Sequence, residues 1–193
     1  MTQQPHHPFN ESDYQHMLDA MFVKQNEELW SRLREQIAEE QRVDELSKAI
    51  GIDDKELIQS LLDMGITARS MAALTMYPMV SVAYADGILG IEERDLIMKM
   101  AGEWNMKPGD PGFEVLNDWL SSGPTEDGLA TWQKYMQAIL AQMNPQQVAE
   151  MKECIMKRSR AVAMAVGDVL GRFGDRTNKA EDARLAEIEA TFP

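Results

Sequence analysis

Carboxylates at two acidic turns are the residues of this sequence best suited to chemistry. The first turn carries Asp86, Glu92 and Glu93, and the second carries Asp175 and Glu181. Carboxylate oxygens are hard ligands, which select Ca²⁺ or Mg²⁺ over Zn²⁺. We therefore take Asp86, Glu92, Glu93, Asp175 and Glu181 as candidate metal ligands, with calcium or magnesium as the cofactor that they would hold.

The first turn matches only half of an EF-hand loop. If Asp86 takes the fifth loop position, Gly87 falls on the sixth and Glu93 on the twelfth, as that loop requires. The first and third positions also need oxygen ligands, but here they are Val82 and Tyr84. A cation at this turn would therefore need oxygens from the second turn or from other acids nearby.

The same residues also serve as ordinary helix signals. Gly87 suits the left-handed position that follows a helix, because it has no Cβ. Gly90 can begin the next helix, which places Glu93 at the third helical position. A carboxylate there can accept a hydrogen bond from a backbone N–H group at the positive end of the helix dipole. The capping role and the cation role both stay open.

Other site chemistries are excluded by residue type. The histidines are confined to positions 6, 7 and 16, and Cys154 is the single cysteine of the chain. Histidine-based triads, zinc sites and disulfides are therefore unavailable to the main body of the sequence. We expect a non-enzymatic protein, with a small Ca²⁺- or Mg²⁺-dependent enzyme that uses the acidic turns as the alternative.

Composition restricts the partners. The chain has 32 acidic and 19 basic residues and a net charge of −13, so nucleic acid is not an expected partner. The basic cluster of Lys152, Lys157, Arg158 and Arg160 is interpreted as a solvated face that pairs with acids elsewhere. The apolar runs are too short for a membrane span and the first residues are polar, so we expect a cytoplasmic location without membrane insertion.

Apolar side chains recur every three or four residues through every long segment, which predicts helices and no strands. The fold class that follows is all-α, a multi-helix bundle. A disordered tail is predicted at residues 1–11. An N-terminal helical extension is predicted at 12–65, with one long helix or two that end near Gln41. The main domain is predicted at 66–193, around a helix–turn–helix at 79–100.

Local signals mark further helix starts. Thr67 is predicted to cap a helix, which Pro78 either kinks or replaces with a new helix. Asn144 and Gln147 predict a capping box. Asn178 and Glu181 form the same kind of signal as Gly90 and Glu93, and apolar positions follow both at matching distances. These matches predict two weakly repeated helix–turn–helix halves.

The first turn resembles the motif of the TerB-like family, which is named for tellurite resistance. The matching residues are Ala85, Asp86, Gly87, Glu93 and Ile97, and the resemblance covers about residues 67–193. In the second half Asp175 and Glu181 match, whereas Arg176 stands where the family motif has glycine. The resemblance implies a helical bundle of two related halves, a bacterial cytoplasmic setting, acidic positions suspected of binding a divalent metal, and no established catalytic activity.

The function that this resemblance implies is an interaction module associated with stress or chemical resistance. Its partner is expected to be a protein whose identity the sequence leaves open, as it leaves open a homo-oligomer. The contact surface is expected on the N-terminal extension or in a groove rich in methionine and tryptophan.

Overall fold

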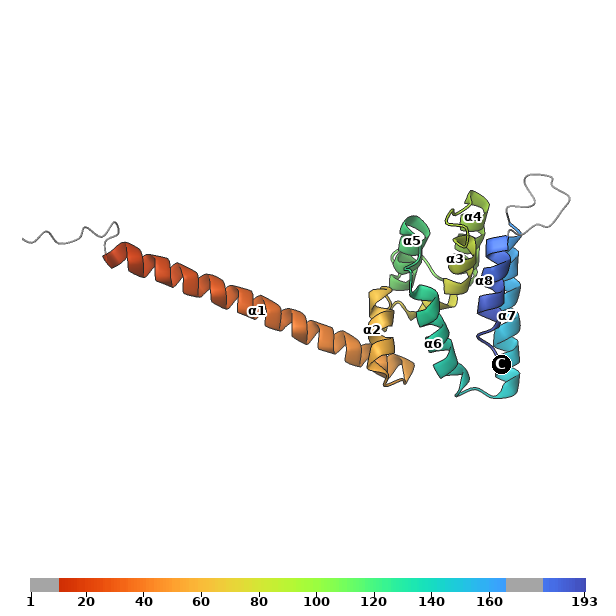
Figure 1. Cartoon of the computed structure of the whole chain (residues 1–193), viewed down its shortest axis with the longest axis horizontal. Coiled ribbons are helices and arrows are strands. Elements are labelled where there is room, and N and C mark those ends of the chain that lie inside the picture. Colours follow the sequence, from red (N-terminus) through yellow and green to blue (C-terminus); the bar gives the residue numbers. More distant parts are fainter. Residues whose placement is uncertain (1–10, 166–178) are drawn as a thin grey trace, which may run out of the picture. The chain divides into compact units, whose positions relative to one another are not determined.

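The computed structural model describes residues 11–165 and 179–193 (Figure 1). All regular elements within these ranges are helices, so the prediction of an all-α, multi-helix protein is confirmed. None of the described helices combines the length and the apolar composition that crossing a membrane requires. The chain divides into two units, Met1–Arg42 and Val43–Pro193.

Helix α1 runs without interruption over Glu11–Ile50, so the expected end near Gln41 is wrong. The segment from 41 to 50 contains no glycine or proline, and its Val43, Leu46 and Ile50 continue the apolar spacing. The helix stops only at Gly51, whose φ of 68° lies in the left-handed region. The last turns of α1 belong to the second unit, where Leu46 and Ile50 are buried.

Helix α2 covers Lys55–Asp63. The Asp54 carboxylate caps it by accepting hydrogen bonds from the backbone N–H groups of Glu56 and Leu57. Gly65, with a φ of 83°, follows its end. Both caps are formed by residues within a few positions of the helix ends.

The segment after Gly65 departs from prediction. No α-helix begins at Thr67; instead the Ser70 hydroxyl donates to the Gly65 carbonyl oxygen and accepts from the Thr67 N–H group, which closes a turn. A short 3₁₀ helix, η1, covers Met71–Thr75 and α3 covers Tyr77–Ala83. Pro78 therefore begins a new helix, one of the two alternatives that the sequence leaves open.

Helix α3 is the centre of the second unit. All of its residues are buried, and it packs against η1, α4 (Ile91–Glu103), α5 (Pro111–Ser122), α6 (Gly128–Leu140), α7 (Pro145–Ala163) and α8 (Lys179–Glu189) (Figure 1). Helices α7 and α8 also pack against each other. The helix is therefore enclosed by its neighbours, whereas Asp86, Gly87 and Ile88 in the turn after it are exposed.

Specific polar contacts hold this arrangement in register. The Arg94 guanidinium of α4 donates to the Leu120 carbonyl oxygen at 2.7 Å and to Asn117 Oδ1 at 3.1 Å, which ties α4 to α5. The predicted capping box of α7 is confirmed, because Asn144 and Gln147 exchange hydrogen bonds. Asn178, which belongs to the second predicted start signal, lies outside the described residues.

Candidate functional site

The turn between α3 and α4 has the backbone that its sequence predicts. Gly87 has a φ of 87°, in the left-handed region. Asp86 is exposed, and its Oδ1 accepts a hydrogen bond from the Ile88 N–H group at 3.0 Å. Gly90 is extended, with φ −69° and ψ 151°, and directly precedes the first residue of α4. The turn thus places the Glu93 side chain, in the first turn of α4, inside the core.

Glu93 is the central side chain of this site. It is 2% exposed, and its Oε2 accepts a hydrogen bond from the Gly90 N–H group at 2.7 Å. This contact is one half of a capping box. The other half, a hydrogen bond from the Glu93 backbone N–H group to the side chain of the N-cap residue, cannot form because Gly90 has no side chain. Within the described part of the chain, Glu93 Oε1 is a buried oxygen without a hydrogen-bond partner. Such an atom loses its hydration on folding and gains nothing in return.

Burial raises the pKa of Glu93 from its ordinary 4.5 to about 7. The hydrogen bond from Gly90 favours the charged form and lowers the pKa, whereas the negative charges of Glu181, Asp86 and Glu92 raise it further. Near neutral pH the carboxyl group therefore populates both its protonated and its charged form. A carboxyl group with a pKa near neutrality can take up or release a proton under physiological conditions.

The five predicted ligands are only partly brought together. Glu93 in α4 and Glu181 in α8 are both buried, and the Glu181 charge acts on Glu93 although the two belong to different halves of the sequence. Glu92 is half-buried and Asp86 is exposed. Asp175 lies outside the described residues. The site that the structure describes is thus centred on a pair of buried carboxyl groups.

The described residues supply few oxygens for a divalent cation. Across 11–165 and 179–193, no group of three His, Cys, Asp or Glu side chains is arranged to hold a metal ion. Ca²⁺ takes six to eight oxygen ligands, and Mg²⁺ keeps several waters that a 2% exposed carboxyl group leaves little room for. The buried Glu93 Oε1 is therefore better suited to bind a proton than to bind a hydrated cation. The cation site stays a prediction.

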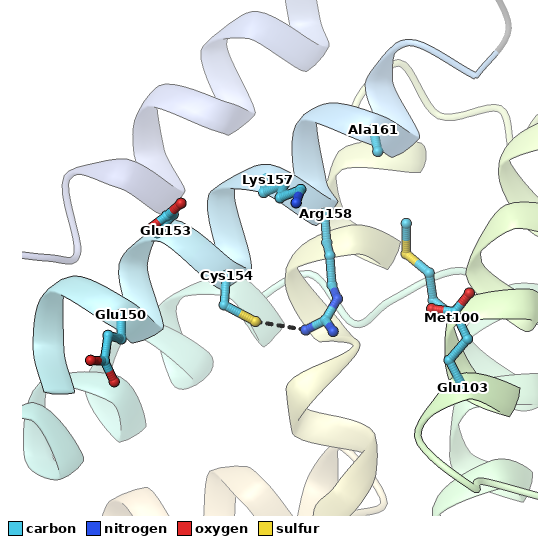
Figure 2. Close-up of a pocket in the computed structure, with 8 residues that line it drawn as sticks. All are labelled: Met100, Glu103, Glu150, Glu153, Cys154, Lys157, Arg158 and Ala161. Carbon is cyan, nitrogen blue, oxygen red and sulfur yellow. Dashed lines mark hydrogen bonds between the residues drawn. The ribbon is translucent and has the colours of Figure 1, made fainter.

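The members of the basic cluster have different partners in the structure. Lys152 and Arg160 pair with Glu189, at 3.7 and 3.1 Å, as a solvated face would. Arg158 instead stacks on the Trp104 ring and donates a hydrogen bond to Cys154 Sγ (Figure 2). The spacing of four residues between Cys154 and Arg158 on one helix was the available signal, but the position of Trp104 depends on tertiary packing.

No family model, curated protein or solved structure matches the chain. The resemblance to the TerB-like family therefore rests on the residues of the first turn and stays a prediction.

Proposed function

We propose that this chain is a TerB-like, non-enzymatic interaction module, and that its first helix binds a partner protein in a cytoplasmic complex linked to stress or chemical resistance. The observation that carries the interaction role is an exposed apolar stripe on α1. The association with resistance follows from the family resemblance alone.

The stripe consists of Leu29, Trp30, Leu33 and Ile37, which are 54%, 62%, 36% and 53% exposed. Their spacing puts them on one face of a helix. Covering apolar surface is worth about 25 cal/mol per Å², and a tryptophan is a frequent anchor of protein interfaces. Isolated exposed apolar residues are ordinary, but four large ones on one helix face favour binding.

The length of α1 supports the same role. Residues 11–42 of this helix form a unit separate from the bundle. Helices in proteins obtain most of their stability from packing an apolar face rather than from intrinsic propensity. A partner that covers the stripe would supply that packing to this segment.

The test compares two double variants of the full chain. Leu33→Gln with Ile37→Gln makes the stripe polar, and Glu28→Gln with Glu35→Gln makes the same type of change on the opposite face. Glutamine is a good helix former, so neither variant should lose α1. Sedimentation velocity and quantitative co-purification from the source cells measure assembly.

We expect the stripe variant to lose its assembly and the control variant to keep it, with equal helix content by circular dichroism. Assembly that survives in both variants would contradict the proposal. A second copy of the chain as the partner would show as a change in the mass of the purified protein.

A further inference from the structure

An apolar cavity of about 320 Å³ lies among η1, the C-terminal end of α4, α6 and α7. Its lining includes Trp104, Trp132, Tyr135, Met136 and Met151, with Cys154 also on its wall. Liquid water occupies about 30 Å³ per molecule, so the cavity has room for roughly ten non-hydrogen atoms. Ligand-binding pockets begin at about this size and are mostly apolar, with a few polar groups that fix the ligand.

Arg158 is held beside this cavity by two of the residues that line it. Its guanidinium carbon lies 4.1 Å from the centre of the Trp104 ring, and Nη1 donates to Cys154 Sγ at 2.7 Å. Cys154 also lines a second, more polar hollow of about 600 Å³, and Arg158 itself is part of that lining (Figure 2). Cys154 lines both the apolar cavity and the polar hollow, and the guanidinium is held against this shared residue and against Trp104.

Arg158 differs from two other arginines of the bundle in its binding partners. Arg160 and Arg184 have carboxylate partners, whereas over the described ranges no carboxylate lies within ion-pair distance of Arg158. Three carboxylates, those of Glu103, Glu150 and Glu153, also line the hollow without pairing with Arg158, and the last two point away from its guanidinium in Figure 2. A guanidinium has five N–H donors, and the thiol takes one of them. A planar guanidinium already held by stacking is well suited to bind a carboxylate through two hydrogen bonds.

We propose that the cavity binds a small organic acid, with its apolar body among Trp132, Tyr135 and Met136 and its carboxylate on Arg158. Aromatic and methionine side chains adapt to aliphatic or flat ligands. A neutral apolar molecule would leave the cation without its counter-charge, and a small polar anion would leave the cavity empty. This ligand site goes beyond the protein-binding role of α1 and does not depend on it.

Calorimetric titration of the full chain with decanoate tests the proposal, because its carbon chain matches the estimated capacity. Decanol and acetate are the comparison ligands, since each keeps only half of the decanoate chemistry. We expect saturable one-to-one binding of decanoate and weaker binding of both others. Arg158→Gln should weaken decanoate at least about tenfold and leave decanol unchanged, whereas Arg160→Gln on the same helix should change neither. No saturable decanoate binding, or equal affinity in Arg158→Gln and the wild type, would overturn the proposal.

The cavity itself is tested by filling it. Ile155 lines the cavity and is half-buried, so Ile155→Phe should reduce decanoate and decanol binding together by about tenfold, without lowering the unfolding temperature. Ile139→Phe fills the cavity from α6 instead of α7. It shows whether an effect of Ile155→Phe comes from the loss of cavity volume or from altered packing around residue 155. Decanoate binding that persists unchanged in both folded variants would show that the ligand lies elsewhere, and would overturn the proposal.

Discussion

The backbone N–H group of Gly90 donates to Oε2 of Glu93 at 2.7 Å, while Oε1 of the same buried carboxyl group has no partner among the described residues. One hydrogen bond does not offset the loss of hydration around a buried negative charge. The pKa of Glu93 therefore stands at about 7 rather than 4.5. The free energy of unfolding therefore depends on whether this one buried side chain is protonated.

The first prediction is a fall in stability between pH 4.5 and pH 7. In this interval the folded state holds more protons on Glu93 than the unfolded state does, because the folded pKa is the higher one. The free energy of unfolding contributed by this group is greatest below pH 4.5, decreases as the pH rises to 7, and is constant above. A shift of this size corresponds to roughly 3 kcal/mol, measurable by urea unfolding at pH 4.5 and pH 8.

Glu93→Gln isolates the contribution of this carboxyl group. The amide is neutral at both pH values and its oxygen can still accept from Gly90, so the variant should lack most of that decrease. Relative to the wild type, it should gain roughly 3 kcal/mol between pH 4.5 and pH 8. Glu103→Gln makes the same change at an exposed position of α4 and is the control, because Glu103 is not among the charges that raise the pKa of Glu93. Equal pH profiles for Glu93→Gln and the wild type would contradict the assignment.

The sequence predicted the contact between Gly90 and Glu93 because helix-start signals are local: the residue types and their spacing define the geometry. It could not predict that Glu93 is buried beside Glu181, since that proximity depends on how α4 and α8 pack. The stacking of Arg158 on Trp104 escaped prediction for the same reason. The extension of α1 past Gln41 followed from the missing stop signal, which becomes visible only at Gly51.

The second prediction concerns the divalent cation. Because no three His, Cys, Asp or Glu side chains among the described residues are placed to hold a metal ion, we expect millimolar Ca²⁺ or Mg²⁺ to leave the unfolding temperature unchanged. A bound cation at a hundredfold excess over Kd would instead add about 2.7 kcal/mol. A stabilisation that Glu93→Gln and Asp175→Asn both abolish would establish a shared cation site and refute this expectation.

The third prediction contrasts two glycines in helices. A Cβ on Gly128, at the start of α6, would overlap the hydroxyl of the buried Tyr77 and lie 2.8 Å from Thr125 Oγ1. Tyr77 packs edge-on against Trp119 and has little room to move. Gly128→Ala should therefore destabilise the protein by about 1–3 kcal/mol in urea unfolding.

Gly102 in α4 is the matched control. Its Cβ would meet no atom within 4 Å, and it lies inside a helix. Gly102→Ala should stabilise the protein by roughly 0.5–1 kcal/mol, through the helix propensity of alanine. Gains of similar size at both positions would mean that Tyr77 yields readily, contrary to the tight packing described.

The last prediction separates the unit that begins at Val43 from the domain predicted at 66–193. Removing residues 1–42 truncates α1 but keeps its last turns, with the buried Leu46 and Ile50, and every later helix of the second unit, so cooperative unfolding by circular dichroism should persist at nearly the wild-type temperature. Removing residues 1–65 also deletes Leu46, Ile58 and Leu61, each fully buried in the core. Burying each such side chain contributes about 1.5–3 kcal/mol, and marginally stable domains do not tolerate the loss of all three. We expect that shorter fragment to aggregate in sedimentation velocity; a monodisperse fragment with the wild-type unfolding temperature would instead place the start of the domain after Gly65.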